Sequence, residues 1–192
     1  MPKIGQEPIR REALVQATIA EIGASGTLSV TVGKIAKRAG MSSALAHHYF
    51  GGKDQMLHAG MRGLLRSLTD QVRLHLATAQ TPRARVEAII HASFDSTCFE
   101  PDTIAAWLNF YVLAQQDPEA QRLLRVYQRR LHSNLKSALR PLSAQPQEHA
   151  EIIAALIDGV YIRQALREGA VGGQQAAARV VSTLDTLIGA AP

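Results

Sequence analysis

The chain has 192 residues, a formal net charge of +5 and a hydrophobic fraction of 46%. This length suits one domain or a small domain joined to a larger one, and no segment is long and apolar enough to span a bilayer or direct secretion. One cysteine, Cys98, excludes an internal disulfide framework, so we expect a cytoplasmic protein whose fold depends on packing alone.

The positive charge is concentrated near the N-terminus. Through residue 66 the sequence has nine Lys or Arg and four Asp or Glu, whereas the remainder has 12 of each sign. A basic end joined to a neutral body is typical of a protein that binds a polyanion with one end and performs another task with the rest. The alternative is a solvated face that happens to be basic.

Helix-forming residues dominate the chain, and no alternating strand pattern is present. The fold class is therefore predicted to be all-α, with prolines and glycines dividing the chain into nine helices. The expected helices cover about residues 8–22, 32–39, 43–49, 53–79, 82–96, 102–116, 118–140, 146–168 and 174–188.

Residues 34–53, KIAKRAGMSSALAHHYFGGK, read as two short helices separated by a turn that contains glycine. This arrangement is typical of a helix-turn-helix. Gly40 permits the left-handed conformation that ends the first helix, and Ala36 is small where the second helix crosses it. Because so small a unit is not stable alone, we expect the first helix of the chain to cover it.

The second helix of this motif presents small and polar side chains on its outer face. Serine and histidine can hydrogen-bond to bases or phosphates, alanine can contact a thymine methyl, and Lys53 begins the next helix with a charge and free N–H groups suited to a phosphate. The alternative is an ordinary helix pair with one solvent-exposed face. The predicted DNA-binding residues are Thr31, Ser42, Ser43, Ala44, His47, His48, Tyr49 and Lys53.

The stretch TVGKIAKRAGMSSALAHHYFGGKDQMLHA resembles the DNA-binding segment of the TetR family of bacterial repressors. The shared pattern is a threonine, Ile-Ala, Ala-Gly, a Tyr/His-rich end, Phe and Lys. The resemblance implies a nine-helix TetR-like fold, with a helix-turn-helix DNA-binding domain at 1–52 and a helical ligand-binding and dimerisation domain at 53–192. It also implies double-stranded operator DNA as a partner, with Lys53 and aromatic residues near Tyr49 on the phosphate backbone.

Several further stretches resemble one branch of that family, the choline-responsive repressors of glycine betaine synthesis. This resemblance implies choline as the effector, control of osmoprotection genes, and no cofactor. The alternative is a TetR-like repressor that senses another quaternary ammonium or a hydrophobic small molecule. The stretches that carry the resemblance are MPKIGQEPIRR, ALAHHYFGGK, TIAAWLNFYVLAQQ, RRLHSNL and ALIDGVYIRQAL.

Seven of the nine aromatic residues lie between residues 94 and 161. Several of them share a face of one expected helix, and a lone acid interrupts the apolar stretch AALIDGVYI. Aromatic walls with a carboxylate suit a quaternary ammonium, whereas an ordinary core with carboxylates paired to arginine is the alternative. The predicted ligand-binding residues are Phe94, Asp95, Trp107, Phe110, Tyr111, Tyr127, Asp158 and Tyr161.

Other chemistry is weakly indicated. Glu87, His91 and Asp95 share one helical face, but solvated helices often carry such stripes, so no metal site is predicted. Cys98 has no activating partner in the sequence, and no catalytic motif is present. We therefore do not expect an enzyme, although an all-helical enzyme is the competing class.

The last two expected helices carry apolar stripes wide enough to face both their own body and a second surface. Operator half-sites one turn apart, ~34–36 Å, require two recognition helices held at that spacing. We therefore expect a homodimer that pairs through these helices. The alternative is that both stripes are buried within one chain.

Overall fold

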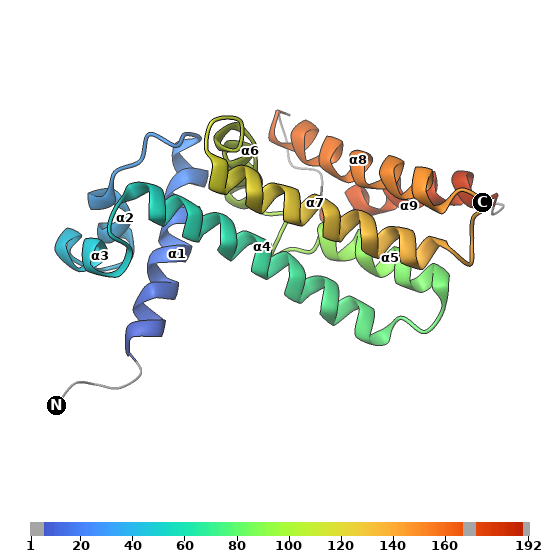
Figure 1. The fold of residues 1–192 in the computed structure, drawn as a ribbon, viewed down its shortest axis with the longest axis horizontal. Coiled ribbons are helices and arrows are strands. Elements are labelled where there is room, and N and C mark those ends of the chain that lie inside the picture. Colours follow the sequence, from blue (N-terminus) through green and yellow to red (C-terminus); the bar gives the residue numbers. More distant parts are fainter. Residues whose placement is uncertain (1–5, 167–171, 190–192) are drawn as a thin grey trace.

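The computed structural model describes residues 6–166 and 172–189, and in these ranges the chain is helical and contains no strand. The all-α prediction is thus confirmed for the described residues. The helices, labelled in Figure 1, are α1 (Gln6–Ser25), α2 (Val32–Arg38), α3 (Ser43–Phe50), α4 (Lys53–Thr78), α5 (Pro82–Ser93), α6 (Pro101–Leu113), α7 (Pro118–Leu139), α8 (Pro146–Ala165) and α9 (Gly173–Ile188).

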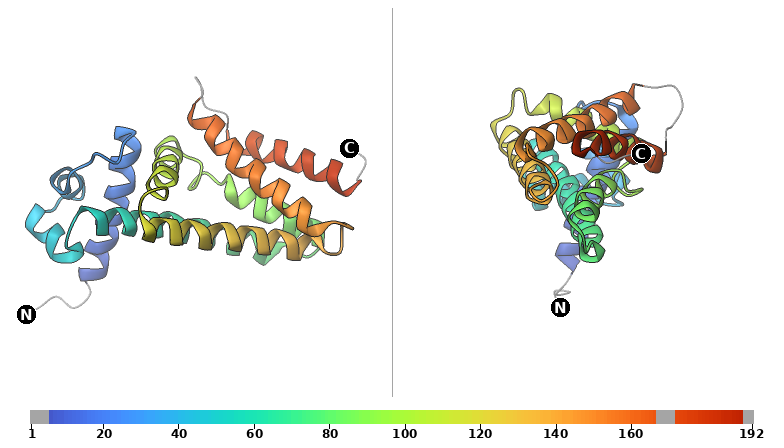
Figure 2. Two further views of the ribbon diagram at one scale, coloured as in Figure 1. Left: turned by 45° about the horizontal axis from the view of Figure 1, so that its top comes forward. Right: turned by 90° about the vertical axis from the view of Figure 1, so that its right-hand side faces the viewer.

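The helices form a small head and an elongated body (Figures 1 and 2). The head consists of α1, α2 and α3, and α4 runs from it into the body, where it packs against α5 and α7. On the other side of the body, α8 packs on α7 and α9 packs on α5 and α8. The long helix α4 therefore belongs to both regions of the molecule.

The joint between head and body is formed mainly by α1 against α6. Gly23 of α1 lies so close to the start of α6 that a Cβ atom there would be 2.5 Å from the carbonyl oxygen of Asp102. Because that neighbour is backbone, it cannot move aside as a flexible side chain would. Glycine at this position allows the head to sit directly on the body.

One continuous hydrophobic core extends through both regions. Burial of each large side chain contributes about 1.5–3 kcal/mol, so the core holds the head and body together. Fully buried members include Leu14, Ile22, Ile35, Met56, Met61, Ile89, Phe110, Leu135, Leu139, Ile153 and Ile157. The predicted domain boundary after residue 52 coincides with the start of α4 and stays a prediction.

Helix ends differ slightly from the sequence-based prediction. α1 continues to Ser25 because Gly26, with φ +64°, provides the left-handed residue that terminates it. α5 ends at Ser93 rather than Ser96, because Phe94 leaves the helix to pack in the interior. The predicted end of the eighth helix, Glu168, lies outside the described residues.

Candidate functional site

The helix-turn-helix predicted from the sequence is formed by α2 and α3. The Thr31 hydroxyl accepts a hydrogen bond of 3.2 Å from the Lys34 amide, and the Ser42 hydroxyl accepts one of 3.2 Å from the Leu45 amide. Each side chain therefore caps the N-terminus of one helix. Gly40 has φ +68°, so the turn between the two helices uses the left-handed conformation expected of it.

The two faces of this motif have opposite character. Ile35, Ala36 and Ala46 are almost completely buried and pack in the hydrophobic core. The opposite face of α3 is open to solvent, although the Ser42 hydroxyl caps the helix and His47 Nδ1 lies 3.1 Å from the Gly51 carbonyl oxygen. The exposed residues are Ser42, Ser43, Ala44, His47 and His48.

Aromatic and basic side chains flank the outer face of α3. Tyr49 is half-buried, and the Arg11 guanidinium lies 5.5 Å from the ring centroids of both Tyr49 and Phe50. This cation–π contact fixes a positive charge beside the end of α3. Lys53 opens α4, where no side chain caps the first turn, so backbone N–H groups are available to an anion.

A second candidate site lies between α6, α7 and α8. The Trp107 ring centroid is 5.3 Å from that of Tyr127 and 6.2 Å from that of Tyr111. The Tyr111 and Tyr127 hydroxyls donate hydrogen bonds of 3.0 and 3.3 Å to one oxygen of Asp158. Four of the predicted ligand-binding residues therefore meet; we call Trp107, Tyr111, Tyr127 and Asp158 the aromatic–carboxylate cluster.

The carboxylate in this cluster is electrostatically unusual. Burial raises the pKa of Asp158, although the hydrogen bonds from Tyr111 and Tyr127 partly oppose that rise. Burial also raises the pKa of both tyrosines, chiefly because an ionised phenol would be poorly solvated, so they remain hydrogen-bond donors. None of the ion pairs among the described residues includes Asp158. The site therefore offers a negative charge beside three aromatic rings.

Two other aromatic candidates, Phe94 and Tyr161, form a different group. Phe94 and Tyr161 stack with ring centroids 5.7 Å apart, and Phe99 meets both rings edge-on at 5.2 and 5.1 Å. The Tyr161 hydroxyl donates to the Ser93 carbonyl, and the ring is only 7% exposed. Tight packing and an internal hydrogen bond make this group part of the interior.

Two further candidates lie away from both aromatic groups. Phe110 is fully buried, with its ring close to Gly60 of α4. The Asp95 carboxylate accepts hydrogen bonds from the amide and hydroxyl of Thr97 at 3.0 and 2.9 Å, and these bonds lower its pKa. Its other oxygen is 3.7 Å from His75 Nε2.

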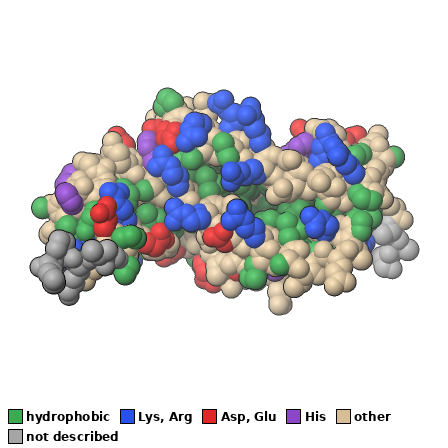
Figure 3. All heavy atoms as spheres, turned by 60° about the horizontal axis from the view of Figure 1, so that its bottom comes forward, with side chains coloured by type: hydrophobic (Ala, Val, Ile, Leu, Met, Phe, Trp, Pro, Cys, Tyr) green, Lys and Arg blue, Asp and Glu red, His purple; other side chains and the backbone are tan. Residues whose placement is uncertain are grey.

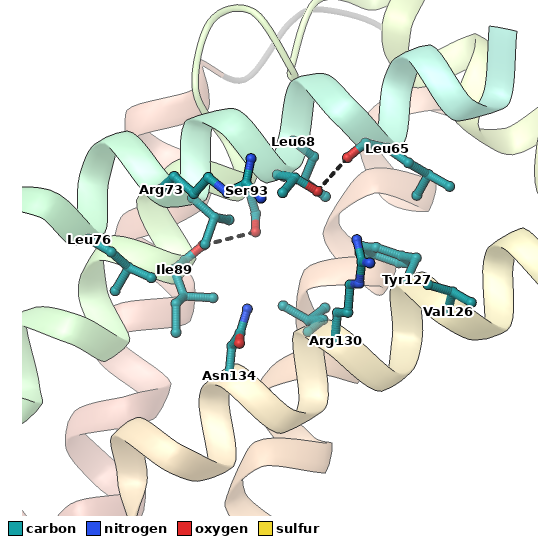
Figure 4. Close-up of a pocket in the computed structure, with 13 residues that line it drawn as sticks. Leu65, Leu68, Arg73, Leu76, Ile89, Ser93, Val126, Tyr127, Arg130 and Asn134 are labelled. Atoms are coloured by element: carbon teal, nitrogen blue, oxygen red, sulfur yellow. Dashed lines mark hydrogen bonds between the residues drawn. The ribbon is translucent and has the colours of Figure 1, made fainter. Parts of the chain in front are cut away.

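A cavity of about 410 Å³ lies between α4, α5 and α7. On the face shown in Figure 3, Lys and Arg side chains surround a recessed hydrophobic area near the middle of the molecule. Figure 4 shows leucines from α4 opposite Tyr127, Arg130 and Asn134 of α7. Neither Arg130 nor Asn134 was predicted as a site residue, because a polar residue on an amphipathic helix normally faces solvent.

The weaker sequence signals have structural explanations. Glu87 pairs with Arg83 at 2.9 Å, and the described residues contain no group of three or more ligating side chains placed to hold a metal. The Cys98 thiol is buried, which raises its pKa and disfavours the reactive thiolate. No helix in residues 6–166 or 172–189 has both the length and the apolar character that crossing a bilayer requires.

The fold and the exposed α3 face define a helix-turn-helix transcriptional regulator, and comparisons with known proteins give its family. Residues 14–59 match the model for bacterial regulatory proteins of the tetR family, and residues 82–189 match the C-terminal domain of BetI-type transcriptional repressors. The chain therefore belongs to the TetR family, with a BetI-type C-terminal domain. The resemblance to the TetR family noted in the sequence is confirmed. The family and the curated relatives of this chain are regulators of transcription rather than enzymes.

Curated relatives cover nearly the whole chain. The HTH-type transcriptional regulator BetI of Brucella anthropi is 51% identical over 94% of both chains. The protein of the same name from Agrobacterium fabrum is 50% identical over 96% of this chain and 91% of its own. These similarities extend through both the head and the body.

Solved structures share the fold at lower identity. A transcriptional regulator of Pseudomonas aeruginosa has a TM-score of 0.80 and 24% identity over 95% of this chain and 91% of its own. A regulator of Saccharomonospora viridis, solved in complex with choline, has a TM-score of 0.77 and 18% identity over 91% of this chain and 95% of its own. The predicted TetR-like fold is thus confirmed.

Proposed function

We propose that this TetR-family regulator represses genes for glycine betaine synthesis from choline, and that it responds to choline bound at the aromatic–carboxylate cluster. The observation that carries the proposal is the half-buried Asp158 carboxylate. It accepts hydrogen bonds from Tyr111 and Tyr127, whose rings lie beside Trp107, and it pairs with no cationic side chain among residues 6–166 and 172–189. The BetI relatives and the choline-bound structure of similar fold support it.

The chemistry of the cluster suits a quaternary ammonium ion. Such a cation has no N–H group to donate, so recognition depends on ring faces and a nearby negative charge, with each ring contributing ~0.5–2 kcal/mol. The Tyr111 and Tyr127 hydroxyls hold the Asp158 carboxylate in place before the ligand arrives. The same carboxylate should repel glycine betaine, which carries its own carboxylate.

The protein is further proposed to act as a homodimer that pairs through α8 and α9. Ile152, Ile162 and Leu166 are large apolar residues that stay 37%, 43% and 78% exposed. Ile152, Ala155, Gly159 and Ile162 follow spacings of three and four residues, so they share one face of α8, and Leu166 lies just beyond the C-terminal end of that helix. The small residues in the middle of this face would allow a second α8 to approach closely.

Operator DNA is the proposed partner of the head, and the site of action is the cytoplasm. The proposed contacts are the exposed face of α3, Thr31 at the start of α2 and Lys53 at the start of α4. In a dimer, any change in the angle of α4 alters the spacing of the paired α3 helices. A ligand that favours one spacing of the α3 helices changes the affinity of the protein for operator DNA. Because binding equilibria are linked, DNA changes the affinity for the ligand by the same factor.

Isothermal calorimetry on the purified protein tests the effector assignment. We expect saturable binding of choline and betaine aldehyde, and at least about tenfold weaker binding of glycine betaine because of its repulsion by Asp158. A larger quaternary ammonium that binds tenfold more tightly than choline would show that another cation is the effector. No binding by any of these cations would overturn the assignment.

A further inference from the structure

The cavity between α4, α5 and α7 differs chemically from the aromatic–carboxylate cluster. Tyr127 is the one residue common to both, whereas Trp107, Tyr111 and Asp158 do not line the cavity. The thirteen lining residues in Figure 4 include no Asp or Glu. A quaternary ammonium would therefore meet no negative charge inside this cavity.

The wall of the cavity is mainly aliphatic. Its volume of about 410 Å³ lies within the usual range for small-molecule sites, ~300–1,000 Å³. Ile89 of α5 is almost completely buried beneath it, and α4 contributes most of the opposite side. A linear alkyl chain would fill such a space. The aliphatic members of the lining are Leu65, Leu68, Val72, Leu76, Ile89, Val126 and Leu131.

Cationic and amide groups stand at the edge of this aliphatic space. Arg130 and Asn134 are one turn apart on α7, both are exposed, and Figure 4 shows both side chains extending toward α4. Arg73 lies across from them on α4, but its guanidinium pairs with Asp70 at 3.2 Å. Among the ion pairs formed by the described residues, none includes Arg130. Its charge is thus available to an incoming anion.

We propose that this cavity binds a second ligand, an amphiphile with a linear alkyl tail and an anionic head group. The tail lies among the α4 and α5 side chains, and the head group accepts hydrogen bonds from Arg130 and Asn134. Because Tyr127 borders both sites and α4 forms one wall, occupancy of the cavity is expected to alter both the aromatic–carboxylate cluster and the helix that leads to the head.

Decanoate, kept well below the concentration at which it forms micelles, is the probe for this proposal. Binding is measured by calorimetry and by the fluorescence of Trp107, the single tryptophan of the chain, whose ring lies 5.3 Å from that of Tyr127. We expect saturable binding at one site per chain. We also expect Arg130→Gln to weaken it about tenfold or more, while Arg129→Gln, one residue away and outside the lining, leaves it unchanged.

A second pair of measurements separates this site from the choline site. Asp158→Asn should leave decanoate affinity unchanged, and Val72→Phe, which fills part of the cavity, should weaken decanoate binding. Three outcomes would each overturn the proposal. They are competitive displacement of decanoate by choline, equal decanoate affinity in the wild type and Arg130→Gln, and no saturable binding of decanoate. If choline proved not to be the effector, decanoate binding would still depend on Arg130. The two proposals can therefore fail independently.

Discussion

The Tyr111 hydroxyl donates a hydrogen bond of 3.0 Å to Asp158, and this bond joins α6 to α8 across the body of the protein. Tyr127 of α7 donates to the same carboxylate oxygen at 3.3 Å. Three helices therefore meet at one half-buried acid. A cation bound there would contact all three helices at once, which gives ligand binding a direct mechanical effect on the body.

Replacing Asp158 by Asn tests the role of this acid. The amide has the same shape and can still accept from the two tyrosines, but it removes the charge that attracts a cation. We expect choline affinity to fall by at least about tenfold, equal to ~1.4 kcal/mol, with no loss of thermal stability. Calorimetry and thermal unfolding provide the two readouts. The control is Glu87→Gln on α5, and an equal loss of choline affinity there would contradict the assignment.

Choline binding should also depend on pH through Asp158. Because burial raises the Asp158 pKa above its ordinary value of 3.8, this carboxyl is partly protonated at pH values where an exposed aspartate is fully charged. Choline requires the charged form, so its affinity should rise with pH through the raised pKa and then level off. Calorimetry as a function of pH should show this rise in the wild type and a flat profile in Asp158→Asn.

The same raised pKa has the opposite effect on the stability of the ligand-free protein. The folded state holds the Asp158 proton more tightly than the unfolded state, so this group stabilises the fold fully below pH 3.8. That contribution is lost as pH rises through the folded-state pKa. The stability of wild type relative to Asp158→Asn should therefore decrease across this window in denaturant titrations. An increase would mean that the Asp158 pKa is lowered.

Ile162 on α8 tests the proposed dimer interface. Ile162→Arg would place a charge within the exposed apolar face of α8, so we expect a monomer in analytical ultracentrifugation. Loss of the paired heads should weaken operator binding about a hundredfold or more. The matched control is Val112→Arg on α6, where the valine is 57% exposed but lies off the α8 face. Dimers in both variants would place the interface elsewhere.

Lys53 tests the DNA-binding surface. If its charge contacts one phosphate, Lys53→Gln should reduce the slope of log affinity against log salt concentration by about 0.9. Arg140→Gln, at the opposite end of α7 from the head, should leave this slope unchanged. Fluorescence anisotropy with a labelled operator at several salt concentrations measures both. Equal slopes for Lys53→Gln and the wild type would remove Lys53 from the contact surface.

Gly23 tests the joint between head and body. A Cβ atom at this position would meet the backbone of Asp102, so Gly23→Ala should destabilise the protein by ~1–3 kcal/mol. Gly33→Ala adds a Cβ that meets only ordinary contacts at 3.6 and 3.9 Å, and it should be neutral or stabilising. Urea unfolding of both variants provides the comparison. Equal stabilities would show that α1 and α6 can separate without cost.

Much of this architecture could be predicted because it depends on local signals. The sequence shows the caps at Thr31 and Ser42 and the glycine at position 40 that adopts the left-handed conformation. It also shows the prolines that begin α5, α6, α7 and α8. These signals act within one turn of a helix, so they do not require knowledge of the tertiary fold.

The grouping of the aromatic residues could be predicted only in part. Trp107 and Tyr111 share a helical face, but Phe110 between them faces α4, and only packing decides which side of α6 meets which neighbour. The meeting of Tyr127 with Asp158 joins residues 31 positions apart on different helices. Side-chain spacing within one helix carries no information about such a contact.

Transcription in vitro, from a promoter that the protein occupies selectively, tests whether choline acts on repression through Asp158. Wild type and Asp158→Asn are compared at fixed salt over a range of choline concentrations. We expect choline to relieve repression by the wild type, and Asp158→Asn to repress equally well without choline but to need at least about tenfold more choline for relief. Relief of both proteins at the same choline concentration would contradict this expectation.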